Sequence, residues 1–182
     1  GKVMVVDLGG GTFDVTIAEV NGKKVDVIHS EGNPNLGGKD FDRLILKFMS
    51  EEYKNQLGAE LSIDDVEYLL QAEELKKILS TRETHAIVID GPNGPSKKIE
   101  ITRNQFDDLS SNLIEAMKLK MDSCVKKAKL QKNDISQILL VGGSTRMPCV
   151  ISAIKEVMGK EPTKGVNVDE AVASGAALYA GT

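Results

Sequence analysis

The stretch with the clearest capacity for chemistry is a glycine-rich turn at residues 7–14, which read DLGGGTFD. The apolar run before it and the alternating residues after it predict strand, turn, strand. Consecutive glycines let backbone N–H groups converge without Cβ clashes, and such a concavity binds phosphate oxygens. The Asp7 carboxylate could hold a hydrated metal ion, and the Thr12 hydroxyl could add a ligand. A plain glycine-rich hairpin is the alternative for this stretch alone.

A second candidate turn, residues 142–146, reads GGSTR and follows the apolar run at 138–141. Such a run is typical of a strand inside a sheet, and α/β folds bind ligands at the C-terminal ends of their strands. Two glycines would let a flat ligand approach the backbone, and the planar guanidinium of Arg146 could stack on a ring. An ordinary strand-to-helix turn with a solvated Arg is the alternative.

A third candidate is a polar helix face formed by Glu73, Lys76, Lys77 and Ser80. Their i, i+3, i+4, i+7 spacing puts these side chains on one side of a helix. One acceptor, two cations and a hydroxyl could hold a ribose and a purine. Taken alone, this segment is better explained as a solvated charged face.

Hydrophobic periodicity and turn residues predict the elements that must position these groups. Asn21-Gly22 is a hairpin signal, and Thr102 with Gln105 has the pattern of a capping box that begins one long helix through Cys124. In chain order we expect strands at 2–7, 12–20 and 23–30, a helix around 41–49, a helix at 63–81, strands at 85–90 and 97–102, the long helix, a strand at 138–141, and helices at 148–158 and 169–179.

This order predicts an α/β fold with an insertion. Residues 1–56 and 129–182 should form a mixed α/β subdomain, and residues 57–128 a smaller inserted α+β subdomain. A hydrophobic content of 41% supports a buried core, and a net charge of −4 argues against nonspecific nucleic-acid binding. Neither a signal peptide nor a membrane-spanning run is evident, and two distant cysteines fit packed thiols in a reducing, cytoplasmic compartment.

Five ordered segments together resemble one family, the seventy-kilodalton heat-shock chaperones of the actin and sugar-kinase superfamily. The segments are 7–14, 36–42, 72–80, 140–148 and 168–172, and the resemblance covers essentially the whole chain. The resemblance implies the second lobe of an actin-like, ribonuclease-H-like ATPase domain, with ATP or ADP, Mg²⁺ and K⁺ as its ligands. It further implies an ATP-driven chaperone with nucleotide exchange factors, J-domain co-chaperones and unfolded polypeptides as partners, and no nucleic acid or membrane partner.

The resemblance also implies roles for individual residues. Asp7 would support Mg²⁺ and help to order the attacking water, while Thr12 and Asp14 would lie near potassium ions. On the phosphate side, the resemblance implies contacts to the phosphates from Gly10, Gly11 and Thr12, with Gly38 close by. On the nucleoside side, it implies contacts to the ribose from Glu73 and Lys76, and to the adenine from Lys77 and Ser80. It also implies an adenosine pocket lined by Gly143, Ser144, Thr145 and Arg146, with a supporting role for Asp169.

Two residues depart from the family pattern. Lys77 stands where the family usually has an Arg that stacks on adenine, and Lys cannot stack in the same way. Lys39 stands where the family usually has Glu, which reverses a charge near the cleft. Both departures leave open a divergent actin-superfamily ATPase or a non-hydrolysing co-chaperone or exchange-factor relative.

The family's first lobe, with its own phosphate turn and catalytic Lys, has no counterpart in this sequence. We therefore expect an ATPase in the full-length parent, but weak adenosine-nucleotide binding without turnover in this segment by itself. The competing hypotheses are a sugar or acetate kinase, which segments 72–80 and 142–148 disfavour, and a filament-forming actin relative, which nothing in the sequence favours.

Overall fold

A computed structural model describes residues 1–92 and 95–163 of the chain. The chain divides into two compact units: unit 1 comprises Gly1–Gly38 with Leu113–Thr182, and unit 2 comprises Lys39–Asn112. This division reflects packing within each unit. The functional subdomain limits near residues 56 and 128 remain a prediction. The expected helix at 169–179, and Asp169 with it, lie outside the described residues.

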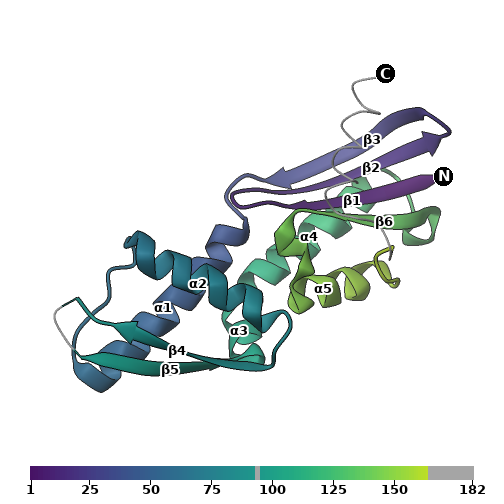
Figure 1. The fold of residues 1–182 in the computed structure, drawn as a ribbon. Helices are drawn as coiled ribbons and strands as arrows, with labels where there is room; N and C mark the ends of the chain where they lie inside the picture. The colour runs from purple at the N-terminus through teal and green to yellow at the C-terminus, as the bar shows by residue number, and fades with distance from the viewer. Residues whose placement is uncertain (93–94, 164–182) are drawn as a thin grey trace. The chain divides into compact units, whose positions relative to one another are not determined.

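Unit 1 is built on a four-stranded mixed sheet (Figure 1). Its strands are β1 (Lys2–Leu8), β2 (Phe13–Asn21), β3 (Lys24–Asn33) and β6 (Ile135–Val141), in the order β3-β2-β1-β6. The β1–β2 and β2–β3 pairs are antiparallel, and β1–β6 is parallel. Alternating residues of the strands are fully buried, as the period of two requires: Met4, Val6, Leu8, Phe13, Val15 and Ile17.

Two helices of unit 1, α4 (Ser111–Lys127) and α5 (Pro148–Met158), lie on one face of this sheet (Figure 1). Short 3₁₀ turns, η1 (Lys132–Asp134) and η2 (Gly143–Arg146), flank β6. The Cys124 thiol on α4 is fully buried and contacts the carbonyl oxygens of Val15 and His29 at 3.7 and 3.8 Å. Burial raises the pKa of this thiol to about 11, so Cys124 is a packing residue.

The hairpin between β2 and β3 differs by one residue from the expected turn. Asn21 and Lys24 pair as strand residues, so Gly22 and Lys23 form the turn, with Gly22 at a φ of 62°. The strand β3 also continues to Asn33, beyond the predicted end at residue 30. A register shift between Ile17 and Ala18 leaves Ile28 of β3 without a partner in the ladder.

Unit 2 combines a β-hairpin with helices. It contains α1 (Gly38–Leu57), α2 (Val66–Leu79), β4 (Thr84–Asp90), β5 (Ser96–Thr102) and α3 (Arg103–Leu109) (Figure 1). The hydroxyl of Tyr53 on α1 donates to the Pro95 carbonyl at 2.9 Å, and that of Tyr68 on α2 donates to the Asp90 carbonyl at 2.7 Å. Both helices are thereby fixed to the end of the hairpin.

The long helix expected after Thr102 is interrupted. The predicted capping box of Thr102 and Gln105 is present and begins α3, but α3 ends at Leu109 and α4 begins at Ser111. Ser110 caps α3 with a φ of −89° and a ψ of −2°, and its side chain is fully buried. Serine is a weaker helix former than Ala or Leu, which makes a break easier here; its hydroxyl has no hydrogen-bond partner among the described residues.

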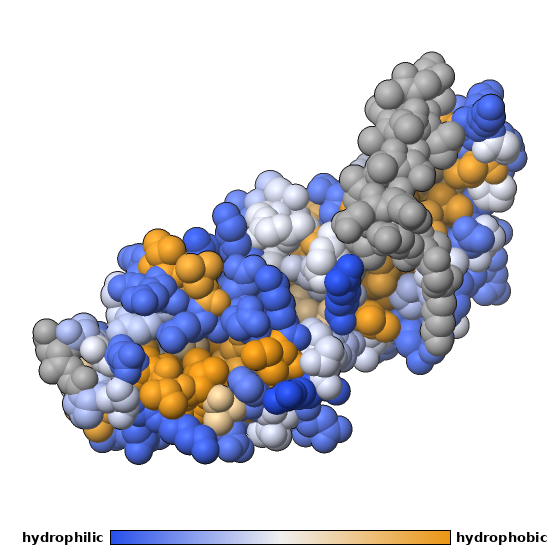
Figure 2. All heavy atoms as spheres, viewed as in Figure 1, coloured by the Kyte–Doolittle hydropathy of each residue, from blue (hydrophilic) through white to orange (hydrophobic). Residues whose placement is uncertain are grey.

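Several large apolar side chains are exposed on unit 2. They lie in the segment before α2, on α2 itself and on β4: Ile63, Val66, Leu70 and Val88. Figure 2 shows apolar side chains gathering on the surface of this unit. Within the described residues, none of the helices combines the length and the apolar character needed to cross a membrane.

Candidate functional site

The glycine turn at residues 9–12 is closed by its own backbone. The register of β1 and β2 ends at Leu8 opposite Phe13, and the Gly9 amide donates to the Thr12 carbonyl at 3.1 Å. Gly10, Gly11 and Thr12 are exposed. The turn therefore presents backbone and one hydroxyl, without bulky side chains, at the end of β1.

A second glycine segment, Gly37-Gly38, packs against the backbone of this turn. The Gly38 amide donates to the Gly9 carbonyl at 2.8 Å. A Cβ on Gly37 would lie 2.5 Å from the Gly11 carbonyl carbon and 2.6 Å from the Gly10 oxygen. Real Cβ atoms essentially never come so close to backbone, so only glycine permits this contact.

Two carboxylates lie side by side next to the turn. Asp7 on β1 pairs directly with Asp14 on β2, and the Thr12 hydroxyl lies 3.5 Å from Asp14 Oδ2. Burial, and secondly the charge of Asp14, raise the pKa of the Asp7 carboxyl above its ordinary value. A cation between these groups would relieve their repulsion.

Two carboxylates and one hydroxyl fit a hard cation that keeps several of its waters, as Mg²⁺ does. In the parts of the chain that the structure describes, no group of three or more His, Cys, Asp and Glu side chains could hold a metal ion. Water and a bound anion would therefore have to complete the coordination of any cation here.

The turn at 142–146 lies beside the first turn. Val141 pairs with Asp7, and a Cβ on Gly142 would lie only 2.3 Å from the Leu8 carbonyl oxygen. Gly142 has a φ of 93°, which side chains rarely tolerate. The buried Thr145 hydroxyl donates to the Gly142 carbonyl at 2.6 Å, which shapes the turn and leaves Arg146 exposed.

The residues of the predicted polar face of α2 have different environments: some are exposed and one is buried. Glu73 and Lys77 form a partly exposed ion pair at 3.0 Å. The hydrogen bond from Lys77 lowers the pKa of Glu73. The Ser80 hydroxyl caps the helix by donating to the Lys76 carbonyl at 3.5 Å.

Lys76 has a different environment from the rest of that face. Its ammonium lies 2.8 Å from Asp42 Oδ1 on α1, and both residues are only 7% exposed. Burial raises the pKa of the Asp42 carboxyl, and the neighbouring ammonium acts in the opposite direction. This buried pair joins α1 to α2 within unit 2.

A family model described as "Hsp70 protein" matches the chain over residues 1–182. The chain belongs to the Hsp70 family. It is 42% identical over 187 residues to the chaperone protein DnaK of Thermosipho melanesiensis, an alignment that covers 98% of this chain. The chain spans 31% of the length of that relative. The mixed sheet with its helices is the α/β architecture predicted for an actin-like ATPase lobe.

Unit 1 of this Hsp70-family chain brings together most of the predicted site residues. The two turns and both carboxylates meet at one end of the sheet: Asp7, Gly10, Gly11, Thr12, Asp14, Gly38, Gly143, Ser144, Thr145 and Arg146. The α2 residues belong to unit 2: Glu73, Lys76, Lys77 and Ser80. Their roles as nucleotide ligands remain predictions.

Sequence reasoning missed the structural roles of three residues. Gly37 and Asp42 lie inside a recognised segment, yet only Gly38 had been assigned to the site. Gly32 lies within β3 opposite Asp14. A glycine in the interior of a strand often marks a close approach, but the predicted strand ended at residue 30, so this signal could not be used.

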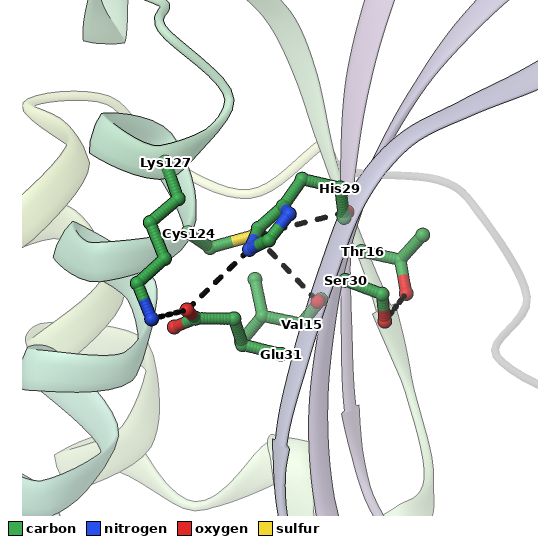
Figure 3. A network of polar contacts seen from close by, with 7 residues as sticks. All are labelled: Val15, Thr16, His29, Ser30, Glu31, Cys124 and Lys127. Carbon is green, nitrogen blue, oxygen red and sulfur yellow. Dashed lines mark hydrogen bonds and ion pairs between the residues drawn. The ribbon is translucent and has the colours of Figure 1, made fainter.

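A polar network joins β3 to α4 (Figure 3). Glu31 Oε1 lies 2.7 Å from Lys127 Nζ and 3.4 Å from His29 Nε2, and the Glu31 side chain is 9% exposed. The hydrogen bond from Lys127 is the main cause that lowers the pKa of Glu31 to about 2, while burial opposes it. The network therefore holds the end of the edge strand in place.

This network should make stability depend on acid pH. Because the pKa of Glu31 falls from 4.5 to about 2 on folding, its contribution is complete above pH 4.5 and disappears as the pH falls toward 2. Lys127 is largely exposed and water screens it, so Glu31→Gln should cost about 1–2 kcal/mol of unfolding free energy at pH 7. Urea unfolding at pH 7 and pH 2.5 measures this, and the cost should shrink at the lower pH.

The matched control is Glu156→Gln, which removes an exposed partner of Lys118. It should change the unfolding free energy by less than about 0.5 kcal/mol at either pH. Equal costs for the two variants at pH 7 would show that the Glu31 network adds no more than a surface ion pair.

Proposed function

We propose that this chain is the adenosine-nucleotide-binding second lobe of a chaperone ATPase domain. In the full-length protein, ATP binding and hydrolysis would be coupled to the binding and release of unfolded polypeptides. The observation that supports this most strongly is the pairing of two backbone turns, 9–12 and 142–146, beside Asp7 and Asp14. Such a site offers backbone amides for phosphates next to an exposed guanidinium for a base.

The phosphate side of the site is the turn at 9–12. Gly10, Gly11 and Thr12 would bind phosphate oxygens, while Asp7 and Asp14 would hold Mg²⁺ or K⁺ through water. When bound, Mg²⁺ would neutralise charge on the phosphates. Asp7, as a partly buried carboxylate, would orient a water molecule by accepting its hydrogen bond.

The predicted adenosine contacts are Arg146 with its turn and the polar face of α2. Arg146 would stack on the base beside Gly143 and Ser144, with Thr145 supporting the turn from within. Glu73, Lys76, Lys77 and Ser80 would serve the ribose and the base edge. Because Glu73 already pairs with Lys77, a ribose hydroxyl would share or replace that partner.

Partners follow from the same proposal. Nucleotide exchange factors would bind unit 2, which carries a charged helix face and the exposed apolar residues Val66, Leu70 and Val88. J-domain co-chaperones and unfolded polypeptide clients would act on the full-length protein. The first lobe of the same protein would complete the cleft.

Adenosine and ADP should bind the isolated chain weakly and with similar affinity, within about tenfold or 1.4 kcal/mol. The adenosine contacts belong to this lobe, whereas phosphoryl positioning requires charges from both lobes, so no meaningful ATP turnover is expected. Titration followed by NMR shifts measures both affinities. Arg146→Ala should weaken both ligands by about three- to tenfold through loss of stacking.

Thr12→Ala is the companion variant, because it alters the phosphate turn and should leave adenosine binding nearly unchanged. If adenosine shifts the signals of the 9–12 turn but leaves residues 143–146 and 73–80 undisturbed, the site assignment is wrong. Turnover equal to that of a complete chaperone ATPase domain would contradict the assignment to one lobe.

A further inference from the structure

Gly32 and Asp14 occupy opposite positions in the β2–β3 ladder. Asp14 also pairs with Asp7 across β1–β2, so the three residues form one row across neighbouring strands on one face of the sheet. This is the face opposite to the one where Phe13 and Val15 are fully buried. The row therefore runs along the outer surface of the sheet beside the phosphate turn.

The Asp14 carboxylate fills the space that a side chain at residue 32 would need. A Cβ built on Gly32 would lie 2.3 Å from Asp14 Oδ1 and 3.2 Å from the Phe13 carbonyl oxygen. The first distance is far shorter than any real contact of a Cβ atom, whereas the second requires only a small adjustment. The absence of a side chain at Gly32 thus leaves room for this carboxylate.

The position of the carboxylate has an electrostatic consequence. On its other side Asp14 faces Asp7, a like charge. Lying over Gly32, the Asp14 carboxylate keeps Oδ2 within 3.5 Å of the Thr12 hydroxyl. A carboxylate displaced from Gly32 has to move toward Asp7 or out into solvent, and either movement changes the space between the two acids.

The backbone beneath the carboxylate cannot easily move away. Glu31, the preceding residue, is bound to Lys127 of α4 at 2.7 Å (Figure 3). The β2–β3 ladder continues on both sides of the Asp14–Gly32 pair, through Phe13 with Asn33 and Val15 with Glu31. An added methyl group at residue 32 would therefore displace the flexible carboxylate and leave the strand in place.

We propose that Gly32 is a positioning residue that seats the Asp14 carboxylate away from Asp7, so that a hydrated cation fits between the two. The inference rests on the proposed function only where it takes the two carboxylates as cation ligands. Gly32 itself touches neither cation nor nucleotide. Its effect acts through Asp14.

The test is Gly32→Ala in the full 182-residue chain, without nucleotide. Two readouts are followed by NMR: the χ1 rotamer of Asp14 from side-chain couplings, and line broadening at residues 7–14 by Mn²⁺ alone. The Asp14 rotamer should change in the variant, and Mn²⁺ affinity should fall at least about threefold. Ser30→Ala, on the same face of the same strand, is the matched control and should change neither readout.

A double-mutant cycle with Asp14→Ala separates positioning from a general loss of stability. Once the carboxylate is gone, Gly32→Ala should no longer alter Mn²⁺ affinity and should cost little of the urea midpoint. If Gly32→Ala folds poorly by itself, Asp14→Ala should restore the midpoint. An unchanged Asp14 rotamer or an unchanged Mn²⁺ affinity in folded Gly32→Ala, or an unrestored midpoint, overturns the proposal. Failure of nucleotide binding in the wild-type chain would count against the proposed function and leave this cycle intact.

Discussion

Lys76→Met should lower the unfolding free energy by about 3 kcal/mol, one of the two largest effects we expect in this chain. The ammonium and the Asp42 carboxylate lie 2.8 Å apart and are both 7% exposed. Removing the cation leaves a buried carboxylate without its countercharge, and breaking such pairs typically costs about 3–5 kcal/mol. Urea unfolding at pH 7 measures the loss.

The neighbouring residue offers a matched control. Lys77 also forms an ion pair on α2, but its side chain is 62% exposed, so Lys77→Met should cost less than about 0.5 kcal/mol. The double variant Lys76→Met, Asp42→Leu should recover most of the loss, because apolar replacements of a buried pair are often neutral. Equal losses for Lys76→Met and Lys77→Met would contradict the burial of the Asp42 pair.

This pair shows where sequence reasoning stops. Helical spacing correctly puts Glu73, Lys76 and Lys77 on one helix, but spacing does not reveal which residue faces another element. The partner of Lys76 is 34 positions earlier, on α1, and only tertiary packing brings Asp42 to it. The same limit hid Gly32, whose importance depends on cross-strand register.

Features that depend on residues adjacent in the sequence were predicted more accurately than contacts between distant segments. The turn at 9–12, the capping box of Thr102 and the bounds of α5 depend on adjacent residues, and each was predicted from them. The break at Ser110 was missed because the apolar period continues through it from Phe106 to Cys124. Periodicity reports the buried face of a helix and is insensitive to a short interruption between two helices that keep that face in phase.

Gly37→Ala should cost about 2–3 kcal/mol of unfolding free energy and weaken ADP more than adenosine. The new Cβ would meet backbone atoms of Gly10 and Gly11 at 2.5–2.7 Å, and backbone cannot swing aside as a flexible side chain can. Relief requires the phosphate turn to separate from the segment behind it, including the Gly38–Gly9 hydrogen bond of 2.8 Å. Urea unfolding and the two nucleotide titrations measure these effects.

Gly11→Ala distinguishes this clash from a general intolerance of the turn to side chains. A Cβ on Gly11 meets nothing within 4 Å, so its unfolding free energy should stay within about 0.5 kcal/mol of the wild-type value. The two glycines touch each other, yet the methyl group on Gly37 points into backbone and that on Gly11 into open space. A Gly37→Ala variant as stable as Gly11→Ala would show that the two segments do not pack as closely as 2.5 Å implies. The phosphate turn would then have to keep its shape without support from Gly37.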